Sequence, residues 1–225
     1  MSGPRPVAAI VFDFDGLILD TETAEYDSIS RVFAQHGTAL SLDLWRSFIG
    51  STDHPHWTEV LVEQVDHPID LDAVRADRRR HNRALLAELE VLPGIVDLLD
   101  AARAHCVPVA VASSSPRDWV EPQLERIGLV DRFRTICTRD DVSSGKPAPD
   151  LYELAVSRLG VDAAAAVAIE DSINGCVAAH AAGLAVVAVP SPFLVGLDFA
   201  TANLVVGSAS ELRLDVLSDL VGSPS

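Results

Sequence analysis

Residues 9–16 read AIVFDFDG, an apolar run that ends in two aspartates, Asp13 and Asp15, on either side of a phenylalanine. An apolar run of this length is typical of a strand buried in a sheet. Placing two carboxylates close together away from water raises the free energy unless they share a cation or a proton. The two aspartates are therefore the first candidates for a functional site, although Asp is also a favoured residue of turns and helix caps.

More short apolar runs follow the first, and several are continuous and rich in valine, which favours strands buried on both faces of a parallel sheet. Helical patterns lie between them, and Gly128, Gly160 and Gly183 fall where helices should end. This alternation predicts an α/β fold with a doubly wound, Rossmann-like parallel sheet as its core. The expected strands are residues 7–12, 107–112, 134–137, 165–169, 184–189 and 204–206, and the expected helices of the core are 94–104, 119–127, 151–159, 175–182 and 211–220.

A long interval separates the first expected strand from the second and carries little strand signal. We therefore expect an inserted α-helical cap domain at residues 20–90 and a core domain formed by residues 1–19 and 91–225. The basic cluster at residues 75–83 is most simply a solvated helix face. The amphipathic stretches of the insertion are residues 26–36, 42–48, 57–64 and 71–89.

The composition, with 48% hydrophobic and 22% charged residues, is ordinary for a soluble globular protein. A formal net charge of −16 argues against a general partner among nucleic acids or anionic membranes. No leader is evident, and no stretch approaches the roughly 20 apolar residues that span a bilayer, so we expect a cytoplasmic protein, with a monomer as the default. The isolated cysteines Cys106, Cys137 and Cys176 predict neither a metal knuckle nor a disulfide framework.

Chemically capable residues fall at the carboxyl ends of the expected strands, where open α/β sheets bind their ligands. One of them is Lys146, the single lysine of the chain, and it supplies a compact charge where arginine would present a planar fork. In chain order these residues are Asp13 and Asp15, then Ser113 to Ser115, then Lys146, and finally Glu170 with Asp171.

The carboxylates of this group outnumber its single ammonium, so protons or a divalent cation must offset the surplus negative charge. An all-oxygen set without His or Cys favours a hard cation, and few carboxylates together with a phosphate suit Mg²⁺. Ser113, Ser114 and Lys146 would then be available to bind a phosphoryl group.

Four segments of the chain resemble, in order and spacing, the four motifs of the haloacid dehalogenase superfamily. They are DFDG at residues 13–16, Ser113, Lys146 within GKPAPD at 145–150, and EDSING at 170–175. The inserted helices resemble the α-helical cap of that family, and DTE at 20–22 is similar to its β-phosphoglucomutase-like branch. The resemblance implies a Mg²⁺-dependent phosphatase that hydrolyses a small phosphate monoester, a sugar phosphate or similar metabolite, through an aspartyl-phosphate.

The same resemblance implies roles for the core residues. Asp13 would be the nucleophile, and Asp15 would be the general acid and then the general base. Asp13, the backbone carbonyl of Asp15 and Asp171 would hold Mg²⁺, with Glu170 at or beside the ion. Ser113, together with Ser114, and Lys146 would bind the transferring phosphoryl group.

Substrate contacts are implied with less detail. If the family geometry holds, Glu22 and Arg117 face the cleft, and Arg117 either grips a distal anionic group or is a solvent-exposed helix-start residue. His54 and His56 either contact a ligand or belong to a helix start with exposed imidazoles, and their role is left open.

Two alternative functions remain. A sugar-phosphate mutase is the nearer one, but Glu25 stands where mutases carry a histidine, and Asp53 stands where they carry an arginine that holds the second phosphate. A phospho-receiver or a silent binding module is the more distant one. Receivers are about half as long and lack such an insertion, so the length of the chain argues against that class.

Overall fold

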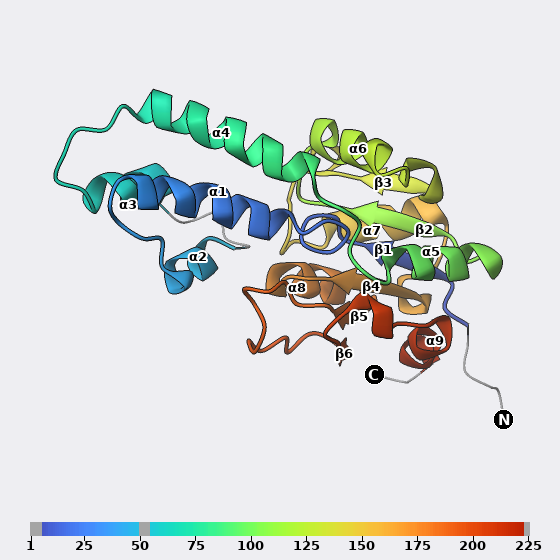
Figure 1. Ribbon diagram of the computed structural model, residues 1–225. Helices are drawn as coiled ribbons and strands as arrows, with labels where there is room; N and C mark the ends of the chain where they lie inside the picture. Colours follow the sequence, from blue (N-terminus) through green and yellow to red (C-terminus); the bar gives the residue numbers. More distant parts are fainter. Residues whose placement is uncertain (1–5, 50–54, 223–225) are drawn as a thin grey trace. The chain divides into compact units, whose positions relative to one another are not determined.

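The computed structural model describes residues 6–49 and 55–222. Its strands form one sheet in the order β3-β2-β1-β4-β5-β6, and every neighbouring pair is parallel. The predicted α/β class, a doubly wound parallel sheet, is confirmed (Figure 1). The strands are β1 (Ala9–Phe12), β2 (Val109–Ala112), β3 (Thr135–Cys137), β4 (Ala166–Glu170), β5 (Ala185–Ala188) and β6 (Leu204–Val205).

The middle of the sheet is buried on both faces. Every residue of β1, β2 and β4 is buried, as continuous apolar runs predict. Phe12, the last residue of β1, is opposite Val111 of β2 and Ile169 of β4, so these three strands end at nearly the same level. The segments that follow them therefore begin side by side.

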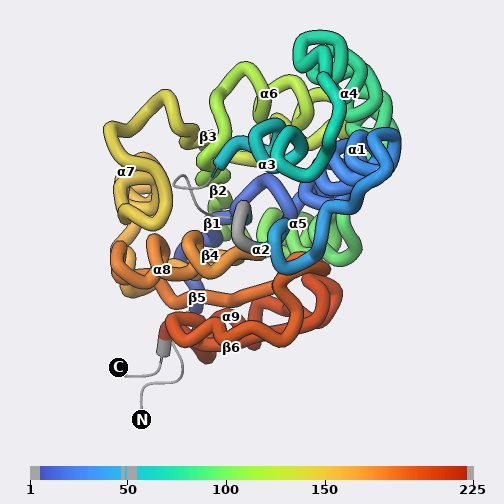
Figure 2. The backbone as a smooth tube through the Cα atoms, turned by 90° about the vertical axis from the view of Figure 1, so that its left-hand side faces the viewer, coloured from blue at the N-terminus to red at the C-terminus, as the bar shows by residue number. Residues whose placement is uncertain are grey.

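Helices cover both faces of this sheet. In Figure 2, α7 and α8 lie on one face, and α5 and α9 lie on the other. Each of the helices predicted for the core overlaps an observed one, and none of the described helices is long and apolar enough to cross a membrane. These helices are α5 (Ile95–Ala104), α6 (Arg117–Arg126), α7 (Asp150–Leu159), α8 (Ile173–Ala181) and α9 (Leu214–Gly222).

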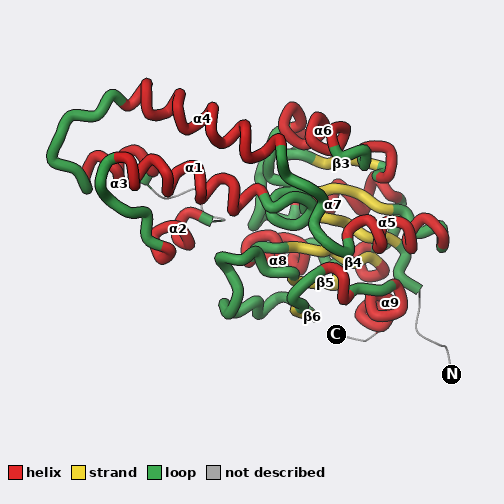
Figure 3. Tube along the Cα trace, in the orientation of Figure 1, coloured by secondary structure: helices red, strands yellow, loops and turns green. Residues whose placement is uncertain are grey.

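The chain divides into two compact units, a core of residues 1–19 with 90–225 and an inserted unit of residues 20–89. The chain leaves and re-enters the core at one place, because Leu19 forms an antiparallel bridge with Val91 and the Leu92 N–H donates to the Ile18 carbonyl at 2.9 Å. The described part of the inserted unit is helical (Figure 3). Its helices are α1 (Thr21–Gln35), α2 (Leu42–Phe48), α3 (Trp57–Glu63) and α4 (Leu71–Ala87).

Helix α1 begins earlier than the predicted residue 26, because the Asp20 carboxylate accepts a hydrogen bond from the Thr23 N–H at 3.0 Å and caps the helix. Its partner α4 meets it through polar contacts. Arg78 of α4 pairs with Glu25 and is only 14% exposed, so this arginine departs from the predicted solvated face. A hydrophobic periodicity cannot show such an inward-facing arginine, because its partner lies on another helix.

Candidate active site

The carboxyl ends of three adjacent strands carry four of the predicted site residues. Asp13 follows β1 directly, Ser113 follows β2, and Glu170 ends β4 with Asp171 after it. The backbone hydrogen bonding between β1 and β4 continues one residue past the end of β1, since the Asp13 N–H donates to the Ile169 carbonyl at 2.9 Å. Adjacent strands lie only about 4.8 Å apart, so the sheet brings these four buried side chains together.

Lys146 comes from the loop between β3 and α7, and its peptide bond to Pro147 is cis. Its ammonium lies 2.5 Å from Asp13 Oδ1 and 2.5 Å from Glu170 Oε1. The Lys146 side chain is 7% exposed. The Tyr152 hydroxyl, from the first turn of α7, donates to the same Glu170 oxygen at 2.5 Å. A single buried cation thus bridges two carboxylates that belong to different strands.

This burial perturbs the ionisation of the bridged groups. Burial raises the pKa of Asp13 to about 8 against the lowering effect of Lys146, and the charge of Glu170 adds to the rise. Burial alone would lower the pKa of Lys146, but Asp13 and Glu170 outweigh it, so the pKa lies above its usual value. Lys146 therefore stays charged, while an ionised Asp13 needs more positive charge nearby than this ammonium provides.

Ligands for a bound cation are present. One carboxylate oxygen each from Asp13, Glu170 and Asp171 lies within 4.8 Å of the other two, and all three residues are buried. An oxygen-only set of this kind fits a hard divalent cation. These three are the carboxylates that the resemblance implies at the metal, and the Asp15 backbone carbonyl stays a predicted fourth ligand.

Two glycines of the motifs make room for these acids. Gly16 has φ +81°, and a Cβ at this position would overlap the Asp171 carboxylate. A Cβ at Gly175 would likewise overlap the Glu170 carboxylate. Glycine is required at both positions because the backbone passes against a carboxylate, and at Gly16 also because of its left-handed conformation.

The Asp15 carboxylate points to a different set of partners. The Trp119 indole N–H donates to Asp15 Oδ1 at 2.9 Å, and the Ser115 hydroxyl donates to Oδ2 at 2.6 Å. The Ser113 hydroxyl is 3.4 Å from the same Oδ2. Both oxygens of Asp15 are thus held by donors from the segment after β2 and from the first turn of α6.

The other two predicted core residues lie near this segment. Ser114 is exposed. Arg117 is engaged in the core, because its guanidinium pairs with Glu121 and with Asp141 and also donates to the Ile136 carbonyl at 3.1 Å. A contact of Arg117 with substrate therefore stays a prediction.

The remaining predicted residues belong to the inserted unit. Glu22 lies in the first turn of α1 and is half-buried, and its role in substrate binding stays a prediction. His56 is the N-cap of α3, where its ring accepts from the Thr58 N–H at 3.3 Å. Asp53 and His54 lie outside the described residues.

Sequence reasoning missed two members of the site, Trp119 and Tyr152, and it named Ser115 only as part of the hydroxyl cluster that follows a strand, without a role. They share one signal, since each lies in or just before the first turn of a helix that starts at the catalytic edge of the sheet. Their donors point back at Asp15 or Glu170. An aromatic residue with a polar tip at such a position is a candidate for holding a site carboxylate.

Comparison with known proteins agrees with this geometry. The family model of the haloacid dehalogenase-like hydrolases matches residues 10–189. YhcW of Bacillus subtilis (strain 168) is 38% identical over 96% of this chain and 99% of its own length. The validoxylamine A 7′-phosphate phosphatase of Streptomyces hygroscopicus subsp. limoneus is 30% identical over 90% of this chain and 94% of its own. A crystal structure of a HAD family hydrolase from Deinococcus radiodurans R1, with bound phosphate and sodium, superposes with a TM-score of 0.81 at 27% identity and covers 98% of this chain and 100% of that one.

Proposed function

Because the chain belongs to the haloacid dehalogenase-like hydrolases, we propose that it is a Mg²⁺-dependent phosphatase that hydrolyses a small phosphate monoester through an aspartyl-phosphate. The arrangement that carries this proposal is Lys146 between Asp13 and Glu170, with Asp171 beside them. In this arrangement a nucleophile, a buried positive charge and a set of metal-ligating carboxylates lie next to one another.

In the first step an Asp13 carboxylate oxygen attacks phosphorus, and the bond from phosphorus to the ester oxygen breaks. Asp15 gives its proton to the departing alkoxide, so the alcohol leaves neutral and Asp15 becomes ionised. The Lys146 ammonium and the buried Ser113 hydroxyl bind the equatorial oxygens of the phosphoryl group, assisted by Ser114.

In the second step water attacks the same phosphorus. Asp15 accepts a proton from the water, the bond from phosphorus to the Asp13 oxygen breaks, and inorganic phosphate leaves. The hydrogen bonds to Asp15 suit this step. Ser115 and Trp119 donate to its two oxygens and so fix the orientation of the carboxylate that accepts the proton. We assign Trp119 and Ser115 as positioning residues for Asp15.

The metal site would be formed by Asp13, Asp171 and the Asp15 carbonyl, with Glu170 at or beside the ion. When bound, Mg²⁺ supplies the charge that keeps Asp13 ionised and that draws electron density from the phosphoryl oxygens.

A small sugar phosphate or similar metabolite is the substrate class that we propose. Two relatives support it by name, the validoxylamine A 7′-phosphate phosphatase and a phosphorylated carbohydrates phosphatase of Thermotoga maritima. Glu22 and Arg117 are the proposed substrate contacts. We further propose that the protein acts in the cytoplasm as a monomer.

The phosphatase assignment is preferred to a mutase on the strength of Glu25. Its carboxylate is bound by Arg78 and by the Asn82 amide, the latter at 2.8 Å, so the position where mutases carry a histidine holds an ion-paired acid. Incubation with glucose 1-phosphate tests the alternative directly, since a mutase would yield the 6-phosphate and a phosphatase would release inorganic phosphate.

The central test is phosphate release from a panel of phosphate esters in the presence of Mg²⁺. The wild type should release phosphate and form an acid-stable phosphoenzyme, and Asp13→Asn should do neither. Asp198→Asn is the matched control, because Asp198 is an exposed aspartate of the same unit. Full turnover by the Asp13→Asn variant, or turnover that EDTA does not suppress, would contradict the proposal.

A further inference from the structure

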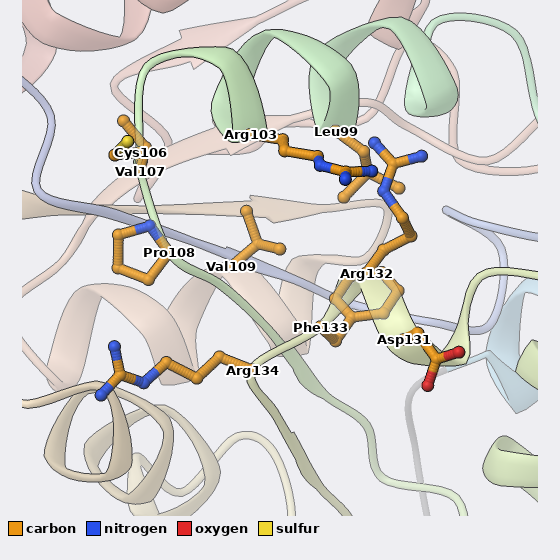
Figure 4. A pocket seen from close by; sticks show the side chains of 10 residues that line it. All are labelled: Leu99, Arg103, Cys106, Val107, Pro108, Val109, Asp131, Arg132, Phe133 and Arg134. Carbon is orange, nitrogen blue, oxygen red and sulfur yellow. The ribbon is translucent and has the colours of Figure 1, made fainter.

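A cavity of about 610 Å³ lies at the edge of the sheet opposite the acidic cluster. It is lined by the last turns of α5, by the start of β2 and by the segment from η1 (Val130–Arg132) to β3 (Figure 4). Val109 opens β2 and lines the cavity, whereas Ser113 follows the other end of the same strand. The volume is in the range of small-molecule sites, about 300–1,000 Å³.

The cavity gathers positive charge in a strongly acidic protein. Arg103, Arg132 and Arg134 line it together with one acid, Asp131, although the chain has a formal net charge of −16. In Figure 4 the side chains of Arg103 and Arg132 extend toward each other along one wall, and Arg134 lies at the opposite side. These guanidiniums create a local field that favours an anion over a neutral ligand.

The arginines also have free donor capacity. Arg103 and Arg134 are exposed, and within residues 6–49 and 55–222 neither side chain forms an ion pair or a hydrogen bond. Arg132 is 19% exposed and is oriented by Asp100, whose Oδ1 lies 2.6 Å from its Nη2. One guanidinium is thus held in place while its neighbour Arg103 keeps all of its donors available.

The rest of the lining is apolar. Leu99, Val109 and Phe133 are buried and contribute to the walls, and Pro108 lies beside Val109. A wall of this kind suits an aromatic or aliphatic body, while a fully hydrated ion such as free phosphate would gain nothing from it.

We propose that this cavity binds a small amphipathic organic anion, which has an apolar or aromatic body and one carboxylate, sulfonate or phosphate group. Arg103 and Arg132 hold the anionic group, and the body packs against Val109 and Phe133. The site is separate from the catalytic edge, so occupancy does not require turnover.

The probe for the test is 8-anilinonaphthalene-1-sulfonate, an aromatic sulfonate that a phosphatase cannot hydrolyse. Its fluorescence should report one saturable site per chain, with an affinity that falls as salt is added. Inorganic phosphate, which competes at the catalytic edge, should not displace it when the ionic strength is held constant. Displacement by phosphate would place the probe at the acidic cluster and overturn the proposal.

Cys106 locates the bound probe. It is exposed and lines the cavity, whereas Cys137 and Cys176 are buried, so a neutral reagent such as N-ethylmaleimide should alkylate this thiol alone. Alkylation should become about tenfold slower at a probe concentration ten times its Kd, since only the empty site reacts. An unchanged rate at saturating probe would overturn the assignment to this cavity.

Arg103→Gln is the decisive variant, because an exposed arginine without an ion pair can be replaced with little effect on folding. Its Kd for the probe should rise about tenfold, which corresponds to the loss of one charge-assisted hydrogen bond. Arg79→Gln, an equal charge change at an exposed position of α4, is the matched control and should leave Kd unchanged. Equal affinity of Arg103→Gln and Arg79→Gln would refute the role of Arg103.

Discussion

The ammonium of Lys146 fits a space that a guanidinium cannot occupy. Its nitrogen is 2.5 Å from a carboxylate oxygen of Asp13 and 2.5 Å from one of Glu170, and the side chain is buried. A planar fork with its nitrogens spread over a wider area cannot make both contacts from the same position. This explains why the only lysine of an arginine-rich chain lies here.

Lys146→Met and Lys146→Arg should therefore both lower kcat for phosphate release by at least about a hundredfold. The methionine variant removes the charge, and the arginine variant keeps it in the wrong shape. Steady-state kinetics with 4-nitrophenyl phosphate provide the measurement, with circular dichroism as the check on folding. Near wild-type activity of Lys146→Arg would show that charge alone suffices.

Trp119 acts on the reaction through Asp15. Trp119→Phe keeps the ring and removes the N–H that lies 2.9 Å from Asp15 Oδ1, so we expect kcat to fall about tenfold with little change in KM. The loss should be larger for an alkyl phosphate than for 4-nitrophenyl phosphate, because the alkoxide needs the proton of Asp15 more.

The Asp15→Asn background supplies the control for this prediction. A residue that works by orienting Asp15 has nothing to orient there, so adding Trp119→Phe should cause no further loss. An additive loss in the double variant would mean that Trp119 acts independently of Asp15.

At this scale the sequence predicts residues that lie in a recognisable motif or loop and misses those that lie within an ordinary helical pattern. Asp13, Lys146 and Asp171 could be found because each ends a recognisable strand or lies in an unusual loop. Trp119 and Tyr152 could not, because each lies in the first turn of a helix, and nothing in that helix's own sequence shows the carboxylate that it contacts. An indole or a phenol in an amphipathic helix is read as core unless the facing carboxylate is known.

At the scale of elements, one acid ties three segments together. Asp141, in η2 (Arg139–Asp141), accepts from the Thr138 N–H at 2.9 Å, and it pairs with Arg117 of α6 at 2.6 Å and Arg158 of α7 at 3.1 Å. Partial burial raises the pKa of Asp141, but these donors outweigh it and lower the pKa below the usual 3.8. The ionised form is thus favoured by folding.

Asp141→Asn should lower the free energy of unfolding by about 1–2 kcal/mol at pH 7. Because the pKa is lowered on folding, the stabilising effect is complete above the unfolded value and is lost as the pH falls through the folded value. The difference from wild type should accordingly shrink below pH 3.8, which urea unfolding between pH 3 and 7 measures. Asp215→Asn, at an exposed ion pair with Arg213, is the control and should change stability much less. A difference that stays constant down to pH 3 would contradict the assignment.

The elements themselves were predictable because their signals are local. Continuous apolar runs mark β1, β2 and β4, and residues 42–48 were predicted with the bounds that α2 has. The start of α1 was missed because its cap, Asp20, precedes the apolar periodicity by several residues. Arg78 was missed because its burial depends on α1, which no pattern within α4 records.

At the scale of the whole molecule, the acidic cluster links metal binding to stability. Asp13, Glu170 and Asp171 lie at the ends of two strands, so a cation bound among them would join β1 to β4 in the folded state and would be released on unfolding. At a Mg²⁺ concentration a hundredfold above Kd, Tm should rise by about 5–10 °C.

Thermal unfolding with Mg²⁺ and with EDTA measures this shift. Asp171→Asn should lose most of it, and Asp198→Asn, which lies outside the cluster, should keep it. A Tm that does not respond to Mg²⁺ in the wild type, while phosphate release does depend on Mg²⁺, would place the ion elsewhere.

The bridge between Leu19 and Val91 bears on how a chain of this kind can diverge. Since the outgoing and returning segments meet as a hydrogen-bonded pair, the residues between them, 20–90, are inserted into the core at a single point. Lengthening, trimming or exchanging that insertion leaves the register of β1 against its neighbours intact. Related sequences can therefore change the surface of the inserted unit while the site carboxylates of the core stay in place.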